Sequence, residues 1–545
     1  MAVIRDPSVN SIALISSPLI FQSGFVMSNR FSLRTLQFSR DEANSLQLSR
    51  RDVIHCGVNM LAGLSINRSV SGAYSPSMDW VNLLPHLGDD KDITHALTRL
   101  RASGHSHFYL PTGDYLIRRG YDISGLYLRG DGPETIVRAR AESVRQPLPL
   151  MIATGTTRSL PPIADYDAER AILRFLMDPK IQTEEILHLY VPIDGSFSEF
   201  RESYRAGEFA RGGSSSSEFV RLEGPLRGDY WAPSVNGLAV KPATCTLENL
   251  RLVTNTGPAI RLSYCYGATL RNVDVDAKAE HGVTLDRCFR FAVKDCHIRN
   301  VGTGGSSDYG LAIGNSQDGY VEGGQFYGRR HGISIGGGDF SNSLPNRFIK
   351  ISNLHVSNDH MTGVNAADVH GNSAHVVWSN TRVKGGLTVG GRDIRVENCE
   401  MTANLHGIVV TAAEVSGGLF QISNSLLMSR SDPSIRFRGL IDFGGNSNAI
   451  NSKTRTDVTI EVLNCMISVN YRSETGRIIE LRNRGSKHRV NLRVHGLEVL
   501  DGEFGMVAHV KSHPRQAWNG FVRLRGIKGL QRGARLVTGV PSSSE

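Results

Sequence analysis

The 545-residue sequence has few of the features that cross-link a chain or anchor it in a membrane. Its seven cysteines include no Cys-x-x-Cys pair, so the spacing typical of a zinc site is missing. Their odd number and irregular spacing favour buried free thiols over a disulfide framework. No stretch approaches the roughly 18 consecutive apolar residues that a membrane-spanning helix needs. The sequence therefore predicts no membrane span and a fold that rests on packing and hydrogen bonding.

Aromatic residues are also scarce, at 7% of the chain, whereas 57 residues are glycine. Together with many short apolar stretches, this composition favours short strands joined by tight turns. The formal net charge of +9 favours an anionic partner. Lysine and arginine are spread along the chain and form no block typical of nucleic-acid binding. We therefore expect an acidic glycan as the partner and no nucleic acid, with ordinary solubility charge as the alternative explanation.

A repeat begins near residue 245 and carries the main structural signal. Each unit is an alternating apolar run, then Asn, Asp or Gly, then a second apolar run. The central positions of the clear copies are Asn249, Asn272, Asp295, Asn353, Asn398, Asn424 and Asn464, with weaker copies at Gly323, Asn380 and Gly496. The first two gaps are 23 residues and later gaps run from 18 to 40. Such a period with short β runs indicates a solenoid, and Asn suits a corner because it tolerates the left-handed conformation and can hydrogen-bond the next coil's Asn.

A second column supports the same register. Glycine followed by an apolar residue begins another predicted strand in each coil. The copies are His281-Gly282, Tyr309-Gly310, His331-Gly332, Thr362-Gly363 and His406-Gly407. Two independent columns predict an all-β, right-handed parallel β-helix.

The segment before the repeats contains a predicted helix and two strands. Residues 92–103 have helical periodicity, with Ile93, Leu97 and Leu100 on one face. A Pro-x-Gly-x-Tyr strand (108–117) and a Gly-x-Gly turn (126–132) follow. This order resembles the N-terminal module of the pectate-lyase-like superfamily, whose solenoids need a capping helix over the exposed end of the core. The resemblance is specific for fold, because the superfamily contains lyases, hydrolases, epimerases and phage tailspikes.

We predict five segments from these patterns. Residues 1–75 form an export signal or a disordered tail, and 76–140 form the first coils and the cap. Residues 141–240 break the pattern with several prolines and the run Gly212 to Ser217, and are predicted to be an insertion with flexible loops. The β-helix coils occupy 241–535, and 536–545 form a tail.

The stretch Ser49 to Ile54 contains Arg50-Arg51 before a weakly apolar segment. It resembles a twin-arginine export signal. This predicts a periplasmic or secreted protein, and a chance Arg-Arg pair in a disordered tail is the alternative.

Two neighbouring coils contain the candidate chemistry. Asp368 and His370 are two residues apart on a predicted strand and so face the same side, and His331 begins the matching strand one coil away. Counting from the aligned glycines places Asp339 and Asp393 beside His370 as candidate substrate-binding residues. An imidazole flanked by carboxylates has its charged form favoured and its orientation fixed, which suits a general acid or base.

Cleavage of a uronic acid polymer by β-elimination needs a group that neutralises the carboxylate, a base and an acid. Arg329 and Arg330 are the candidates for neutralisation, because arginine binds a carboxylate in bidentate fashion. The base is His370 or His331. The acid is Tyr309, one coil from His331.

Two resemblances compete at these residues. Asp368-Val369-His370-Gly371 is similar to the Asp-Pro-His-Glu motif of mannuronan C5-epimerases, with Val and Gly in place of Pro and the acid. The stretch from His331 to Gly336 is similar to the Gly-His-Gly-x-Ser-Ile-Gly segment of polygalacturonases. That family needs paired aspartates in the preceding coil, where only Asp308 stands, with Asp286 as a further acid.

The sequence thus predicts an exported carbohydrate-active enzyme on an acidic polysaccharide, with lyase or C5-epimerase chemistry. An inverting glycoside hydrolase on the same fold is one alternative, and a non-catalytic glycan-binding or tailspike-like protein is another. We expect no metal or other cofactor. The resemblance leaves calcium open, because some lyases use it, although no carboxylate-dense loop argues for a site.

Overall fold

A computed structural model describes residues 80–140, 148–198, 200–228, 234–303, 307–337, 341–359, 364–430, 439–444, 457–482, 489–511, 520–530 and 533–538. The predicted export signal lies outside these residues. So do Asp339, Thr362 and Gly363. Among the described residues, no helix is long and apolar enough to cross a membrane.

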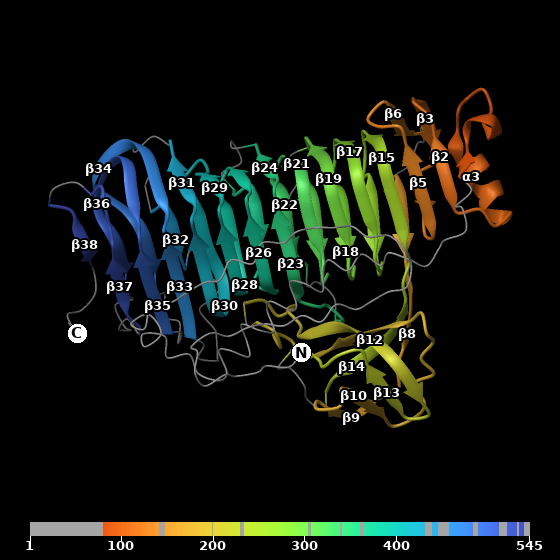
Figure 1. Ribbon diagram of the computed structural model, residues 1–545, viewed down its shortest axis with the longest axis horizontal. Helices are drawn as coiled ribbons and strands as arrows, with labels where there is room; N and C mark the ends of the chain where they lie inside the picture. The colour runs from red at the N-terminus through yellow and green to blue at the C-terminus, as the bar shows by residue number, and fades with distance from the viewer. Residues whose placement is uncertain are drawn as a thin grey trace, which may run out of the picture. The chain divides into compact units, whose positions relative to one another are not determined.

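The predicted cap is helix α3 (Ile93–Ala102), which packs at one end of the coils (Figure 1). Asp92 begins it by accepting a 2.8 Å hydrogen bond from the Thr94 amide, which satisfies one of the free donors of the first turn. Ile93, Ala96, Leu97 and Leu100 are buried on its inner face. The helix therefore covers the apolar end of the solenoid as predicted. A two-residue strand β1 (Val81–Asn82) and a short 3-10 helix (Leu84–His86) precede it.

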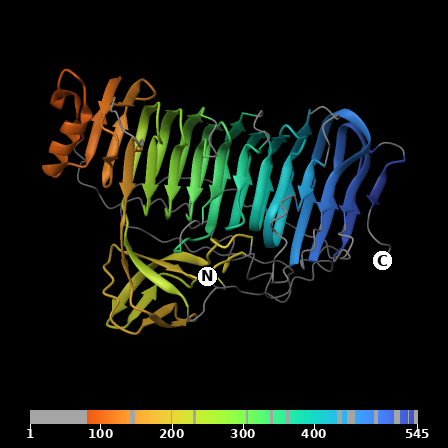
Figure 2. The same cartoon turned by 180° about the vertical axis from the view of Figure 1, so that it is seen from behind.

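Thirty-one parallel-paired strands follow one another in coils that run from α3 to the C-terminal strands, as both views show (Figures 1 and 2). The strands fall on three faces, each a ladder in which every coil pairs with the coil before and after it. Long strands pass through corners. Those shared by faces 1 and 2 are β15 (Cys245–Thr254), β17 (Thr269–Ala277), β19 (Ala292–Asn300) and β21 (Tyr320–Gly328).

Face 1 also contains β2 (His107–Leu110), β5 (Leu126–Gly130), β23 (Asn346–Ser352), β26 (Ser373–Ser379), β33 (Asp457–Leu463), β35 (Arg489–His495) and β37 (Val522–Arg525). Face 2 also contains β3 (Gly113–Ile117), β6 (Thr135–Ala139), β24 (His355–Asn358), β27 (Arg382–Lys384), β29 (Glu400–Thr402) and β31 (Leu426–Ser429).

Face 3 contains β4 (Tyr121–Asp122), β7 (Met151–Thr154), β16 (Ile260–Ser263), β18 (His281–Asp286), β20 (Tyr309–Gly314), β22 (His331–Gly336), β25 (Ala367–Val369), β32 (Ile441–Phe443) and β38 (Arg535–Thr538). Strands β28 (Leu387–Glu397) and β30 (Val410–Ser423) run from face 3 into face 1. Strands β34 (Met466–Arg482) and β36 (Glu498–Lys511) run from face 2 into face 3. Strand β38 crosses the predicted start of the tail at residue 536.

The predicted Asn column is confirmed at the corner between faces 1 and 2. All ten predicted positions stack in register and have a positive φ, from 49° at Asn272 to 71° at Gly323. Asn272 donates a 2.9 Å side-chain hydrogen bond to Asn249 in the coil before it. A left-handed residue costs about 1–2 kcal/mol for most side chains, so Asn, Asp and Gly recur where each coil turns.

The second column is right for three copies and wrong for the later ones. His281, Tyr309 and His331 pair in register on face 3. In the next coil Ile333 pairs with Ala367, so Asn365 stands opposite His331, not Thr362. His406 is displaced for the same reason, because Leu387 pairs with Val410. More residues separate β24 from β25 than separate β21 from β22, so counting residues from the aligned glycines gives the wrong register.

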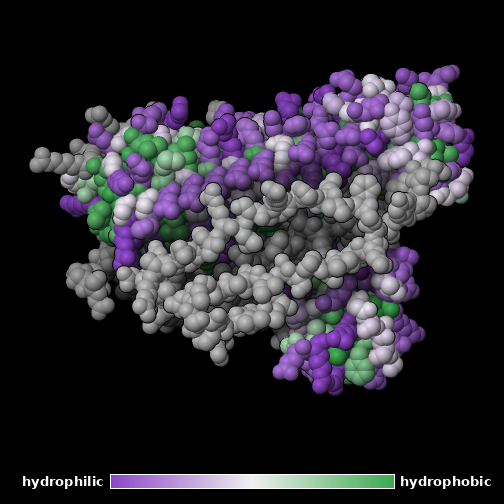
Figure 3. All heavy atoms as spheres, viewed as in Figure 1, coloured by the Kyte–Doolittle hydropathy of each residue, from purple (hydrophilic) through white to green (hydrophobic). Residues whose placement is uncertain are grey.

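Inward side chains of the three faces form one apolar core that runs through all coils. The six described cysteines are buried free thiols within it, as predicted. Outside, hydrophilic residues dominate around β15 to β24, and hydrophobic residues gather over the C-terminal coils (Figure 3). Met466 and Leu500 there are 41% and 49% exposed.

The interruption between β7 and β15 forms a separate seven-stranded antiparallel sheet. Its strands, in spatial order, are β8 (Thr156–Ser159), β14 (Asn236–Lys241), β11 (Ile186–Tyr190), β12 (Gly207–Ser216), β13 (Phe219–Leu222), β10 (Ile172–Phe175) and β9 (Ile163–Asp167). The run Gly212 to Ser217, which the sequence placed in an insertion with flexible loops, lies largely within β12. Antiparallel pairing with β13 satisfies its backbone without any contribution from its side chains.

The insertion packs on the β-helix through an apolar cluster that contains Phe209 and Phe289. His188 of β11 lies beside it, with its ring near Phe209 and Tyr264 at centroid distances of 5.3 and 5.9 Å. Its side chain is fully buried, and neither ring nitrogen makes a hydrogen bond of good geometry. Burial, assisted by the charge of Arg287, lowers the pKa of His188 to about 3, and the nearby Asn342 backbone opposes a part of this shift.

Because an unfolded histidine titrates near 6.5 and folded His188 near 3, the unfolded chain binds more protons between these pH values. Stability therefore rises with pH in this window, and His188 contributes a slope of about 1.4 kcal/mol per pH unit. We predict that His188→Phe removes this part of the slope in denaturant titrations from pH 4 to 7. A constant difference between parent and variant across that range would contradict the assignment.

Candidate active site

A cleft of about 350 Å³ opens on face 3, over the strands from β22 to β32. Most of the residues that line it have polar side chains, and one of them, Arg201, belongs to the insertion. The groups that the following argument uses are Arg201, Arg330, His331, Asn365, Asp368, His370, Asn404 and Glu414. A cleft of this volume is in the usual range for a ligand site.

The structure brings three of the predicted residues together at the floor of this cleft. Nε2 of His370 lies 2.8 Å from Oδ2 of Asp368, and Nε2 of His331 lies 3.7 Å from the same oxygen. Parallel pairing of β22 with β25 places Ser334 against Asp368 and so brings the two histidines to the carboxylate from adjacent coils. Gly336 leaves room for the His370 ring, because a Cβ there would lie 2.9 Å from His370 Cδ2.

Charge and burial shift the pKa values of the two histidines in opposite directions. Burial lowers the pKa of His331, although Asp368 opposes the shift. The charge of Asp368 raises the pKa of His370 despite its burial. Burial alone would raise the pKa of Asp368, but the charge and hydrogen bond of His370, then the charges of His331 and Arg330, bring it well below its usual value. Asp368 is therefore ionised and His370 is the imidazole that it supports.

The ring nitrogens have different surroundings. Nδ1 of His331 lies 2.6 Å from the Asn365 carbonyl oxygen, which can only accept, so this nitrogen carries a proton. The His331 side chain is 5% exposed and that of His370 is 22% exposed. Among the described residues, His370 Nδ1 has no hydrogen-bond partner. His370 is thus the more accessible of the two proton-transfer candidates.

Tyr309 is not among the residues that line the cleft, and the other predicted residues take different positions. Arg330 lines it and also lies over the Tyr309 ring, with its Cζ 5.9 Å from the ring centroid. The Tyr309 ring lies 5.0 Å from that of His331, and burial raises its pKa. Arg329 does not line the cleft. It follows β21 on face 2, so the two adjacent arginines sit on either side of a corner.

Asp393 lies away from the cleft. Its carboxylate is 3.7 Å from His375 and accepts a 3.0 Å hydrogen bond from the Leu419 amide. Strand β28 leaves face 3 through a register shift between Val389 and Arg392, so Asp393 belongs to the next corner, with φ 52°. A glycine count that assumes no bulge places it wrongly.

Three important residues were not predicted. Glu414 is buried and accepts hydrogen bonds from Arg201 Nε (2.9 Å), the Tyr204 hydroxyl (2.7 Å) and the Gly371 amide (3.0 Å). Burial and the Glu414 charge raise the pKa of Tyr204, which therefore keeps its proton and donates. A lone acid inside the apolar run Ala412 to Val415 was a usable signal for Glu414. Nothing in the sequence marks Arg201 or Tyr204, which are more than 200 residues away.

Asn365 was also missed, although it organises one side of the cleft. Its Nδ2 donates to Thr388 (2.8 Å) and Thr411 (3.2 Å), and its Oδ1 accepts from Asn404 (2.6 Å). These groups come from successive coils of face 3. They fix the loop whose carbonyl orients His331.

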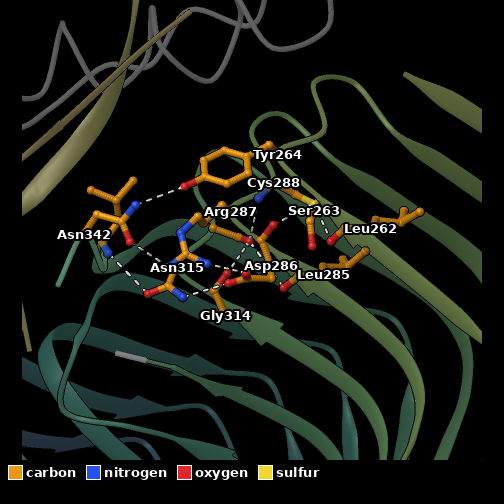
Figure 4. Close-up of polar contacts among 12 residues, drawn as sticks. Leu262, Ser263, Tyr264, Leu285, Asp286, Arg287, Cys288, Gly314, Asn315 and Asn342 are labelled. Carbon is orange, nitrogen blue, oxygen red and sulfur yellow. Dashed lines mark hydrogen bonds and ion pairs between the residues drawn. The ribbon is translucent and has the colours of Figure 1, made fainter. Parts of the chain in front are cut away.

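The acids considered for an inverting hydrolase do not meet. Asp286 pairs with Gly314, six residues along the strand from Asp308, which corresponds to about 20 Å. Inverting enzymes separate their two carboxyl groups by about 6.5–9.5 Å. Asp286 instead joins a polar cluster in which Asn315 donates to it over 2.8 Å and Arg287 pairs with it (Figure 4).

No three His, Cys, Asp or Glu side chains of the described residues are arranged as ligands of one metal ion.

The chain is similar to a known protein family and to several solved structures. Residues 277–512 match the family model described as Gp49, pectin lyase-like. The tailspike protein gp49 from Pseudomonas phage LKA1 is similar with a TM-score of 0.74 and 28% identity, over 81% of this chain and 75% of that chain. No curated protein matches the sequence.

Two further tailspikes share the fold. The tailspike gp61 of Pseudomonas phage phi297 has a TM-score of 0.69 and 22% identity, over 80% of this chain and 73% of that chain. The gp54 tailspike of Acinetobacter baumannii bacteriophage AP22, solved with a capsular saccharide, has a TM-score of 0.68 and 18% identity, over 84% and 76%. Fold and coil register show that the chain is a parallel β-helix, and residues 277–512 are similar to the pectin lyase-like family model.

Proposed function

We propose that the face 3 cleft binds an acidic polysaccharide and cleaves it by β-elimination. The observation that carries the proposal is the ionised, mostly buried Asp368 between two imidazoles, in a cleft that also presents Arg330 and Arg201. Perturbed titratable groups that gather in a cleft are typical of catalytic sites.

His370 is the proposed base. Asp368 accepts the Nε2 proton and so selects the tautomer in which the other ring nitrogen, Nδ1, is unprotonated. That nitrogen takes the proton α to the uronate carboxylate, and the resulting imidazolium is stabilised by Asp368. His331 is more buried, and its Nδ1 donates a hydrogen bond to the Asn365 carbonyl oxygen. In this proposal it is a positioning residue.

Arg330 and Arg201 neutralise the substrate carboxylate. The positive charge lowers the energy of the enolate-like anion that forms when the α proton leaves. The Arg201 side chain is 48% exposed and its Nη2 is paired with Glu414 over 2.9 Å, so it has a defined direction and an open side. Tyr309 is the proposed acid. It keeps its proton, because burial raises its pKa, and gives it to the leaving glycosidic oxygen.

C5-epimerisation shares the first proton transfer and differs in the fate of the anion, so the same residues support it. A non-catalytic, tailspike-like role is the second candidate function. The three tailspike similarities, one of them a structure with a capsular saccharide, support the tailspike-like part of this candidate. In either role the proposed ligand is a polysaccharide outside the cell.

The direct test incubates the full chain with polygalacturonate, alginate, hyaluronan and bacterial capsular polysaccharides. Ultraviolet absorbance of a new double bond and reducing ends are followed together. We expect both to rise on one substrate, and His370→Gln to lower the rate at least 100-fold, a typical loss for a general base. His375→Gln, an imidazole paired with Asp393 outside the cleft, is the matched control and should retain the rate. Reducing ends without absorbance would exclude β-elimination.

The pH profile tests the Asp368–His370 pair. A base must be unprotonated, so turnover should rise with pH through a His370 pKa that lies above its ordinary 6.5. Asp368→Asn removes the charge that raises this pKa, and the rising limb should move to lower pH. Asp393→Asn, beside His375, should leave it in place. An unchanged limb in Asp368→Asn would remove the pair from the mechanism.

Glu414 should act through Arg201. We predict that Glu414→Gln raises KM about 10-fold, equivalent to about 1.4 kcal/mol, because Arg201 loses the anion that directs it. Arg201→Ala should raise KM at least as much, and the double variant should add little. Fully additive effects in this double-mutant cycle would show that the two side chains act independently.

A further inference from the structure

A second cleft of about 350 Å³ lies on face 2 and shares no lining residue with the face 3 cleft. It extends over β15, β17, β19, β21 and β24. The residues that the argument uses are His297, Arg299, Gln325, Tyr327, His355 and Ser357.

Coil register arranges these side chains in two outward rows. Asp274, His297, Gln325 and His355 are stacked partners in one row. Asp276, Arg299, Tyr327 and Ser357 are stacked partners in the other. The residues between the rows, such as Ile298 and Phe326, are buried and fix the rows from below. Each row of four side chains is about 14 Å long, because neighbouring parallel strands are roughly 4.8 Å apart.

Some charged side chains along the cleft form ion pairs and others do not. At the β15–β17 end, Arg251 pairs with Asp276 and Asp274 pairs with His297 over 3.1 Å. Arg299 of β19 is exposed and pairs in register with Tyr327 of β21, and Arg329 follows Tyr327 by two residues. Within the described parts of the chain, neither of these two arginines makes an ion pair.

Both arginines act on Tyr327. Burial raises the pKa of this half-buried tyrosine and Asp359 adds to the rise. Arg299 is the register partner of Tyr327 in the coil before it, and the charges of Arg299 and Arg329 oppose this rise in pKa. The arrangement is an aromatic side chain flanked by two cations and by the imidazoles of two coils.

We propose that this face 2 cleft is a second saccharide-binding site, which takes a uronate-bearing segment of an acidic glycan. Arg299 and Arg329 bind the carboxylate, and Tyr327 provides an apolar contact for the sugar ring. His297, His355, Gln325 and Ser357 supply donors and acceptors to hydroxyl groups. This inference rests on the proposed function for the nature of the glycan.

The corner Arg329-Arg330 links the two clefts. Arg329 directly follows the face 2 strand β21, beside the residues that line the face 2 cleft, and Arg330 lines the proposed catalytic cleft on face 3. A polymer held at face 2 raises the effective concentration of its other segments at face 3. Long chains therefore gain from the second site, whereas a short oligosaccharide that occupies one cleft does not.

The test measures binding of galacturonate, mannuronate and hyaluronan hexasaccharides to the full chain by titration calorimetry, with His370→Gln present to prevent turnover. We expect two sites for at least one probe. In the background of His370→Gln, adding Arg299→Ala and Arg329→Ala should weaken one site at least 10-fold, and Tyr327→Ala should weaken the same site.

The matched control is Lys350→Ala with Arg395→Ala, which removes two exposed cations in register on face 1. It should leave both sites intact. Unchanged binding in the Arg299/Arg329 variant, or no binding of any probe, would overturn the proposal. Maltohexaose, which is neutral, should not compete, and equal competition would overturn the role of the arginines.

Turnover separates this inference from the proposed function. With His370 intact, the Arg299/Arg329 variant should retain its rate on short oligosaccharides and lose at least five-fold in kcat/KM on polymer. Binding at face 2 without turnover on any substrate would contradict the catalytic proposal alone. Normal turnover with no effect of the face 2 substitutions would contradict the second site alone.

Discussion

Backbone hydrogen bonding between successive coils is the constraint on which this structure depends. Each strand on the three faces pairs with its equivalents in the coils before and after, so a residue's neighbours are set by register and not by its place in the sequence. A slip of one residue would move core side chains to the surface and outward side chains into the core. The left-handed column from Asn249 to Gly496 turns every coil at the same point and so keeps faces 1 and 2 in step.

The candidate site follows from the same constraint at a place where a coil changes length. The loop before β25 puts Asn365 opposite His331 and Asp368 opposite Ser334. A carboxylate at that depth would be costly alone, since burial disfavours its charged form. The imidazoles of His331 and His370, from adjacent coils, compensate this cost. They keep Asp368 ionised, so that its carboxylate can support His370 in the cleft. The two imidazoles that stabilise the charged Asp368 carboxylate are therefore also the groups proposed to take part in catalysis.

The insertion adds what a regular solenoid lacks. A β-helix presents residues in rows, whereas a site for a charged sugar needs groups that approach from several directions. Arg201 and Tyr204 reach across from the insertion and meet Glu414, whose left-handed backbone turns its side chain toward them. The apolar contacts around Phe209 and Phe289 hold that arrangement against the coils. The insertion thus contributes residues to the proposed site.

The sequence by itself determined the β-helix, its capping helix and the Asn column, because these depend on local periodicity and on residue types that tolerate a left-handed turn. It also determined that Asp368 and His370 face one side, since alternation along a strand is local. Tertiary structure decided which residues from other coils meet them. Bulges in β28, the loop before β25 and the approach of Arg201 change register or span more than 200 residues, and no local pattern encodes them. The same applies to Arg329 and Arg330, which are adjacent in sequence but serve different faces because the chain turns a corner between them.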